Sequence, residues 1–223
     1  MRQALNYAID REALNKTFFG GKGGTTSQFI AANIPGNDPS LDNRYPFDLA
    51  KAKQLMADAG YAQGFTLPVL STKVINLSTI MQAVADSWSR IGVKVEQTVK
   101  QPADWQADFT STKFPAMVLP LTGIPAYSSM RTWFGPDAAL NPFKTTDPEF
   151  SQDMSKAASV DVNSGGSTEA LVAANARLLD QAWYVGLMTT SVFYHYNPKK
   201  VTGLEMPIGE STPHFYDWKL GGA

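Results

Sequence analysis

Apolar side chains that recur every three to four residues predict helices along much of the chain. The pattern is clearest from Leu77 to Ile91, where six apolar residues recur over four turns. A second stripe lies between Asp48, a residue type that caps helix starts, and Gly60, a residue type that ends helices. The same reasoning predicts helices at residues 2–9, 11–19, 101–109, 148–158 and 168–183.

Short apolar runs between these helices predict strands. Phe65, Leu67 and Val69 alternate with polar or small residues, and the valines that follow Gly92 have the same period. Further strands are predicted at 116–119 and 188–196. Because proline cannot donate a hydrogen bond to a neighbouring strand, Pro68 predicts an edge strand or a bulge. Helices and strands that alternate in this way indicate an α/β domain.

Two long segments without a period are candidate ligand loops. Residues 22–46 are rich in Gly, Thr, Ser, Asn, Asp and Pro, and ordered domains seldom keep such a long loop without a function. Residues 123–141 follow a predicted strand and contain Tyr127 and Trp133, whose rings either cover a core edge or line a ligand cleft. Beyond residue 197 the chain is irregular, and we expect this tail to need another surface to pack on.

Composition and charge exclude several classes of function. The 223 residues include 19 Lys and Arg against 20 Asp and Glu, without a run of like charge, so the chain has no electrostatic footprint for nucleic acid. The absence of cysteine excludes disulfides, thiolate metal sites and cysteine nucleophiles. The longest apolar run, near residues 116–126, is too short to span a bilayer.

No motif points to catalysis. His195 and His214 are the only strong neutral-pH bases, and they lie in a predicted strand and in the irregular tail. The glycines of residues 20–26 lack the spacing of a phosphate-binding loop and follow a helix instead of a strand. Acidic residues that could form an acid/base pair lie at the start of a predicted helix, where they stabilise the helix dipole: Asp147, Glu149 and Asp153. A small α/β hydrolase and an interaction or scaffold module remain the alternatives; the latter predicts an exposed apolar patch without a cleft.

The chain opens directly in a helix, without capping or lead-in residues. Residues 1–9 lack the apolar stretch and the cleavage site of a secretory signal. We therefore expect a piece of a longer protein, cut at a domain boundary.

Three stretches together resemble one protein family. They are RQALNYAIDRE at 2–12; YPFD at 45–48 with AKAKQL at 50–55 and AGY at 59–61; and IGVKVE at 91–96. In order and spacing they resemble the second lobe of the extracytoplasmic solute-binding proteins, family 5, which serve ABC importers of the dipeptide, oligopeptide and nickel type. DPEF at 147–150 and YHYNP at 194–198 also fit, so the resemblance extends over nearly the whole chain.

The resemblance implies an architecture and a role. The fold would be a periplasmic-binding-protein-like lobe II, a mixed β-sheet flanked by helices, with the first lobe absent. Residues 1–196 would form the second lobe, and residues 197–223 would be a return segment and tail that packs on the missing N-terminal lobe. The whole protein would work outside the cytoplasm, close two lobes on a small solute and deliver it to an ABC permease, without a cofactor, a metal or chemistry on the ligand.

The resemblance also implies where the solute binds. In the family, the second lobe contacts its ligand through the loop after the opening helices, the start of a helix, the loop after the central strand and a late strand. The corresponding candidates in this chain are Gln28, Phe29, Asn33, Asn76, Thr122, Gly123, Tyr127, Trp133 and Tyr194.

One departure from the family pattern concerns the solute. Peptide-binding members carry Gly-Trp and then an aspartate after the central strand, and the aspartate pairs with the peptide's amino terminus. Here the segment at 120–127 is PLTGIPAY, and no acidic residue lies between Asp108 and Asp137. A buried ammonium would have no counter-charge. The sequence therefore favours a neutral or anionic solute, such as an oligosaccharide or a modified amino-acid conjugate, over a plain peptide.

Overall fold

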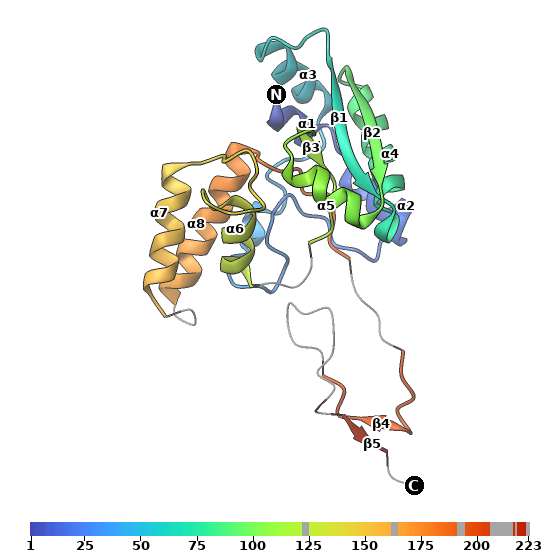
Figure 1. The fold of residues 1–223 in the computed structure, drawn as a ribbon, viewed down its shortest axis with the longest axis vertical. Helices are drawn as coiled ribbons and strands as arrows, with labels where there is room; N and C mark the ends of the chain where they lie inside the picture. Colours follow the sequence, from blue (N-terminus) through green and yellow to red (C-terminus); the bar gives the residue numbers. More distant parts are fainter. Residues whose placement is uncertain (122–124, 162–164, 191–194, 206–215, 217, 222–223) are drawn as a thin grey trace.

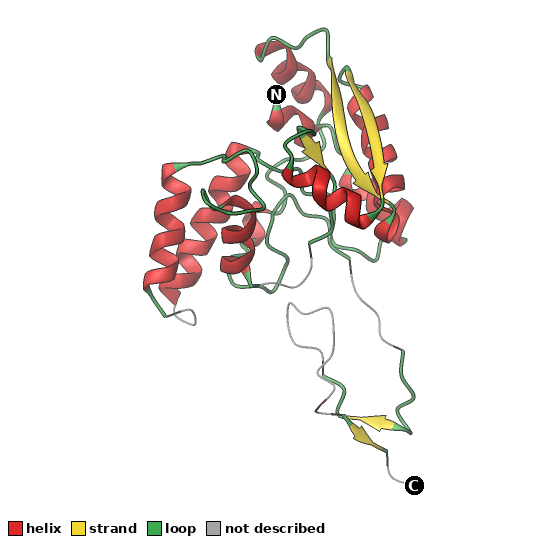
Figure 2. Cartoon of the chain, in the orientation of Figure 1, coloured by secondary structure: helices red, strands yellow, loops and turns green. Residues whose placement is uncertain are grey.

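The computed structural model describes residues 1–121, 125–161, 165–190, 195–205, 216 and 218–221 (Figures 1 and 2). Its helices are α1 (Arg2–Tyr7), α2 (Arg11–Phe19), α3 (Leu49–Asp58), α4 (Leu77–Ser89), α5 (Pro102–Thr110), α6 (Ala126–Phe134), α7 (Pro148–Ser159) and α8 (Gly165–Gln181). Two short 3₁₀ turns are Pro39–Leu41 and Val74–Asn76. The strands are β1 (Phe65–Thr72), β2 (Val93–Lys100), β3 (Ala116–Met117), β4 (Val201–Thr202) and β5 (Lys219–Leu220). Within the described segments, no helix combines the length and the apolar character that crossing a bilayer would require.

The main sheet has three parallel strands in the order β2-β1-β3. β1 pairs with β2 from Phe65 opposite Val93 to Thr72 opposite Lys100, and α4 connects the two strands. The predicted α/β lobe is confirmed. The described strands of this sheet are all parallel, where a mixed sheet was expected.

Helix starts follow the predicted capping residues. The carboxylates of Asp10, Asp48 and Asp147 accept hydrogen bonds of 2.9, 2.8 and 2.9 Å from backbone N–H groups in the first turns of α2, α3 and α7. Gly20 ends α2 in the left-handed conformation, as expected.

The expectation for Pro68 was wrong, because β1 is the central strand of the sheet. Pro68 lies opposite Glu96 of β2, whereas the pairing with β3 begins one residue later, at Val69. The central strand tolerates a proline here because its second neighbour is short and pairs only beyond that residue.

Three other segments differ from the sequence prediction. Residues 126–134, predicted as part of a loop, form α6, with Ala126 and Met130 buried one turn apart against the core. α8 begins at Gly165, within the predicted linker, because glycine accepts helical geometry at a modest cost. Of the strand predicted at 188–196, Thr189 makes an isolated bridge to Gly24, and residues 191–194 lie outside the described residues.

The two largest of four hydrophobic clusters among the described residues define a sheet unit and a helix unit. The sheet unit packs α1 to α4 on β1 and β2, with the Trp88 indole N–H donating to the Leu5 carbonyl at 2.9 Å. The helix unit packs α6, α7 and α8 around Phe150, Met130 and Leu178. Figure 1 shows the helix unit beside the sheet unit, with β4 and β5 apart from both.

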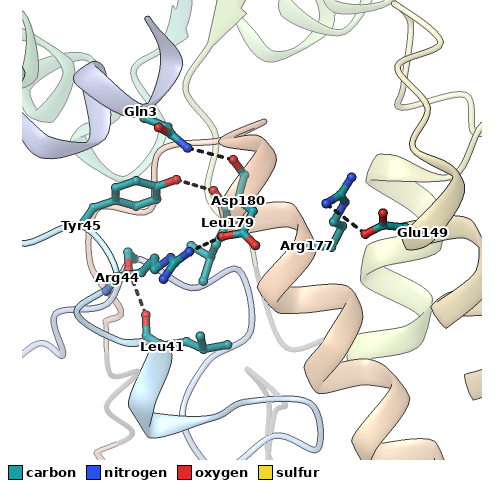
Figure 3. Close-up of polar contacts among 9 residues, drawn as sticks. Gln3, Leu41, Arg44, Tyr45, Glu149, Arg177, Leu179 and Asp180 are labelled. Carbon is teal, nitrogen blue, oxygen red and sulfur yellow. Dashed lines mark hydrogen bonds and ion pairs between the residues drawn. The ribbon is translucent and has the colours of Figure 1, made fainter. Parts of the chain in front are cut away.

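Polar contacts join the C-terminus of α8 to the sheet unit (Figure 3). The Tyr45 hydroxyl donates to the Leu179 carbonyl, and the Gln3 amide donates to the Asp180 carbonyl at 3.1 Å. Arg44 forms an ion pair with the Asp180 carboxylate at 2.5 Å. The end of one helix is therefore fixed by three side chains from α1 and the segment before α3.

Buried Arg11 supports the same junction. Its guanidinium donates to the carbonyls of Gly186 and Tyr45 at 2.8 and 2.9 Å, and to the Asn6 side-chain oxygen at 3.0 Å. Burial lowers the pKa of Arg11 to about 10.

Gly64 and Gly92 make the closest backbone approach between the starts of β1 and β2. An alanine Cβ at Gly64, where φ is +75°, would lie 1.8 Å from the Gly92 carbonyl oxygen. We predict that Gly64→Ala lowers the free energy of unfolding by about 3 kcal/mol or more, because the clash involves backbone that cannot rotate away. Urea denaturation measures this change.

Gly60→Ala is the matched control. Gly60 also has a positive φ, +81°, but no atom lies within 4 Å of the position that an alanine Cβ would occupy there. This variant should lose only about 1 kcal/mol, the cost of a left-handed alanine. Equal losses in the two variants would contradict the role given to the Gly64–Gly92 contact.

Candidate functional site

The carboxyl ends of the parallel strands define the candidate ligand face. β1 ends at Thr72, β2 at Lys100 and β3 at Met117, and parallel strands place these ends at one edge of the sheet. Open α/β sheets bind ligands at this edge. Two predicted site residues come after these ends in the chain: Asn76 lies four residues after β1, and Tyr127 lies ten residues after β3, in α6.

The segment after β1 combines exposure with backbone strain. Ile75 and Asn76 have positive φ values of 51° and 58°, and the Asn76 side chain makes no capping hydrogen bond. Ile75 is 59% exposed although it is apolar and β-branched, a residue type that rarely adopts this conformation. Strained backbone tends to occur at functional sites, and the role of Asn76 in binding a solute stays a prediction.

Gln28 is held inside the lobe. Its side-chain oxygen accepts hydrogen bonds from the Asp38 backbone N–H at 3.1 Å and from the Asn175 amide at 2.7 Å. Its amide group donates to the Asp42 carboxylate. These contacts anchor the loop of residues 22–46 to α8, and the role of Gln28 in binding a solute stays a prediction.

Phe29 and Asn33 lie in the same loop but in different surroundings. The Phe29 ring packs edge-on against Phe134 of α6 and Tyr184, with ring centroids 4.9 and 5.6 Å apart. Asn33 is exposed and has a φ of 66°. The first residue fastens the loop to the helix unit, and the second lies on the surface.

Trp133 of α6 contacts an aromatic stack on α5. Its ring meets Phe109 edge-on at 5.8 Å, and Phe109 stacks on Trp105 at 5.3 Å with the ring planes 3° apart. Trp133 therefore covers a core edge in this structure. The three remaining predicted site residues, Thr122, Gly123 and Tyr194, lie outside the described residues.

Two neighbouring hollows border α6. The first, the α6–α7 hollow, has a volume of about 490 Å³ and is lined by six residues of α7 together with Tyr127, Arg131, Gly135 and Pro136. The second has a volume of about 370 Å³ and is lined by Ser128, Thr132 and residues 138–140, again with Tyr127 and Arg131. Among the predicted site residues that the structure describes, Tyr127 alone lines these two hollows.

Sequence reasoning did not single out Arg131. It lies four residues after Tyr127, a spacing that places two side chains on one face of a helix. The four-residue spacing was visible in the sequence. Residues 123–141 were predicted as a loop, however, and this spacing places two side chains on one face only in a helix.

The acidic residues at the start of α7 have a structural role. The Asp147 carboxylate caps α7 and accepts two hydrogen bonds from Arg177, at 2.9 and 2.8 Å. The Arg177 guanidinium holds the pKa of Asp147 below its ordinary value, so this group is ionised and unsuited to donate a proton at neutral pH. Glu149 pairs with the same guanidinium at 3.0 Å.

Burial raises the pKa of the third candidate acid, Asp153. The described residues include no group of three or more His, Asp or Glu side chains that could hold a metal ion.

Comparison with known proteins places the chain in a family. Residues 1–141 match the family model described as "Bacterial extracellular solute-binding proteins, family 5 Middle". The chain is 28% identical over 218 residues to the glutathione-binding protein GsiB of Pectobacterium atrosepticum, a match that covers 91% of the chain and 41% of that protein. It is 32% identical over 111 residues to the heme-binding protein A of Haemophilus influenzae, covering 48% of the chain and 20% of the relative.

Solved structures show the same fold. HbpA2 from Haemophilus parasuis superposes with a TM-score of 0.81 at 22% identity, over 98% of this chain and 44% of that one. The periplasmic binding protein AgaA from A. tumefaciens, solved with agropinic acid, gives a TM-score of 0.77 at 22% identity, over 100% of this chain and 47% of that one. The chain thus spans less than half the length of the relatives that it matches.

The Asp147–Arg177 pair generates a pH-dependent prediction. Asp147→Asn should lower the free energy of unfolding at pH 7 by about 2–3 kcal/mol, because it weakens a helix cap and a largely buried, bidentate ion pair. The folded-state pKa of Asp147 is depressed, so its stabilisation is present above the unfolded pKa of about 3.9 and is lost as the pH falls through the folded value. Urea denaturation of both proteins between pH 7 and pH 2 should show the difference shrinking below about pH 4.

Glu149→Gln provides the control, because the Glu149 side chain is 70% exposed. Its loss should stay below about 0.5 kcal/mol. A difference between wild type and Asp147→Asn that does not change with pH would contradict the assignment.

Proposed function

The chain belongs to the bacterial extracellular solute-binding proteins of family 5, and we propose that it forms one ligand-binding lobe of the solute-binding component of an ABC importer. In this proposal the whole protein works in the periplasm or another extracytoplasmic space. It closes two lobes on a small solute and delivers the solute to a membrane permease. The lobe itself performs no chemistry on the ligand and needs no cofactor.

The observation that carries the proposal is the extent of the structural match. HbpA2 superposes on 98% of this chain, although the chain accounts for 44% of that structure. A match of this kind fits one lobe of a larger protein better than it fits a complete small enzyme. The hydrolase and scaffold alternatives lack a comparable observation in their favour.

We also propose a division of the chain at residue 196. Residues 1–196 would be the lobe, and residues 197–223 would return to a first lobe that this chain does not include. In support, β4 pairs with β5, and Tyr216 and Leu220 are 85% and 91% exposed. Large side chains with this exposure are expected where a segment packs on another part of the protein.

The proposed solute is neutral or anionic. The segment between Asp108 and Asp137 has no acidic residue to pair with the ammonium group of a peptide. The relatives carry names that refer to heme, glutathione and dipeptides, so chemically different solutes occur among the similar proteins. An oligosaccharide or a carboxylate-bearing conjugate fits this chain better than a plain dipeptide does.

A thermal-shift screen of the two-lobed protein that contains this chain tests the function. We predict that an oligosaccharide or an opine-like conjugate raises the unfolding midpoint by about 2–3 °C at a hundredfold excess over its Kd, because it binds only the folded state. Dipeptides and glutathione in the same screen test the argument about charge. A shift with dipeptides alone would preserve the transport role and refute the proposed solute class, whereas no shift with any probe would count against the role itself.

Removal of residues 197–223 tests the proposed division. We predict that the shortened chain unfolds with a free energy within about 0.5 kcal/mol of the full chain, because the tail contributes little to the two hydrophobic clusters. Urea denaturation followed by circular dichroism measures both proteins. A loss of about 2 kcal/mol or more would place part of the tail within the lobe.

A further inference from the structure

Two side chains of α6, half-buried Tyr127 and exposed Arg131, line both hollows. Tyr127 and Arg131 lie one helical turn apart, and each lines the α6–α7 hollow and its neighbour. The buried side of the same helix holds Ala126 and Met130 against the helix unit. The positions of Tyr127 and Arg131 are therefore fixed by packing on the opposite face of α6.

The lining of the α6–α7 hollow carries a positive charge and no negative one among the described residues. Among the described residues, Arg131 is the single charged residue in the linings of both hollows. Glu149, at the start of α7, pairs instead with Arg177 of α8 at 3.0 Å, and Figure 3 shows this pair between the two helices. Asp153 lies four residues further along α7, on the side of Glu149, and is absent from both linings. Asp137 follows the lining residue Pro136 but is not part of the hollow.

Two of the hydrogen-bond donors in the α6–α7 hollow have no partner in the described part of the chain. The Arg131 guanidinium and the Tyr127 hydroxyl form no hydrogen bond or ion pair with the described part of the chain. The serine hydroxyls that α7 contributes to the lining donate to carbonyls of their own helix, as Ser151 does to Asp147 and Ser155 does to Ser151, both at 2.9 Å. Arg131 and Tyr127 are therefore the side chains that can donate to a molecule in this hollow.

The remaining lining is apolar or small. Phe150 and Met154 form the buried floor, with Ala158 near the end of α7. A guanidinium above an apolar floor matches an organic molecule with one carboxylate, because Arg can donate two parallel hydrogen bonds to a carboxylate. The volume of about 490 Å³ is sufficient for such a molecule.

We propose that the α6–α7 hollow binds a carboxylate-bearing organic molecule, with Arg131 and Tyr127 as its hydrogen-bond donors. This inference rests on the proposed function and deepens it: the carboxylate would belong to the transported solute. The solute would then carry a negative charge, and Arg131 would be the residue of this lobe that recognises it. The hollow lies within this chain, so its binding can be measured without the other lobe.

Benzoate and benzamide form a matched pair of probes, because they share one ring and differ in charge. Titration of the 223-residue chain, followed by calorimetry and by ligand-observed NMR, should show benzoate binding with a Kd of about 1 mM or lower. Benzamide should bind at least about fivefold more weakly. Arg131→Gln should weaken benzoate binding about tenfold or more and leave benzamide binding unchanged, because it removes a charge-assisted hydrogen bond.

Arg90→Gln is the control for net charge. Arg90 is exposed and stacks on Phe47, far along the chain from α6, so its loss changes the protein's charge equally and should leave benzoate binding intact. Ser155→Leu, which fills the hollow from an exposed position of α7, should weaken both probes. Thermal unfolding of each variant confirms the fold, and Arg131→Gln should keep the wild-type midpoint.

Three results would overturn the inference: no benzoate binding at about 20 mM, equal binding of benzoate and benzamide, or equal effects of Arg131→Gln and Arg90→Gln. None of these results touches the proposed transport role, which the thermal-shift screen of the two-lobed protein tests separately. Conversely, benzoate binding that depends on Arg131 would stand even if that screen failed.

Discussion

The burial of one guanidinium constrains the arrangement of the lobe. Arg11 begins α2, yet it donates to the carbonyls of Tyr45 and Gly186 and to the side chain of Asn6, which belong to three separate segments. A buried cation that loses its acceptors costs several kcal/mol, so these segments cannot separate independently. The contacts of Tyr45 and Asp180 at the end of α8 reinforce this junction. The sheet unit and the helix unit are thus held together, and the carboxyl edge of the sheet keeps a fixed relation to α6.

Local rules account for most of the elements. Three helices begin at an aspartate whose carboxylate accepts a hydrogen bond from the backbone N–H three residues later: Asp10, Asp48 and Asp147. Aspartate is a common capping residue, so these helix starts could be predicted from the sequence alone. The tolerance of Pro68 depends on information that no local pattern holds, whereas α6 has a helical pattern that the Gly and Pro residues on either side of it obscured. The tolerance of Pro68 depends on how short β3 is. The helix at 126–134 has apolar residues at positions 126, 130, 133 and 134, the spacing of one helix face, and the burial of Met130 against Phe150 and α8 stabilises it.

The candidate site was predictable only in part, for a related reason. A long polar loop suggested ligand contacts for Gln28 and Phe29, but a sequence does not show whether a loop side chain points outward. In the structure both residues fasten the loop to the helix unit, Gln28 through Asn175 and Phe29 through Phe134. The significance of Arg131 depends on the neighbouring helix, because an arginine becomes a recognition residue only where no carboxylate neutralises it. On α7, Glu149 is paired with Arg177, and this pairing exists only in the folded chain.

The missing acid and the free guanidinium have the same electrostatic consequence. A zwitterionic peptide carries both an ammonium and a carboxylate, and the segment between Asp108 and Asp137 offers a partner for the second group alone. Placing the ammonium near Arg131 would add repulsion to the cost of desolvation, so a solute would have to present its carboxylate to α6. If the transported solute is a peptide, its amino terminus would need a counter-charge from outside this segment. Under the proposed function, the charge pattern of this lobe would set the orientation of a zwitterionic solute, and it would favour an anionic conjugate or an acidic sugar over other solutes.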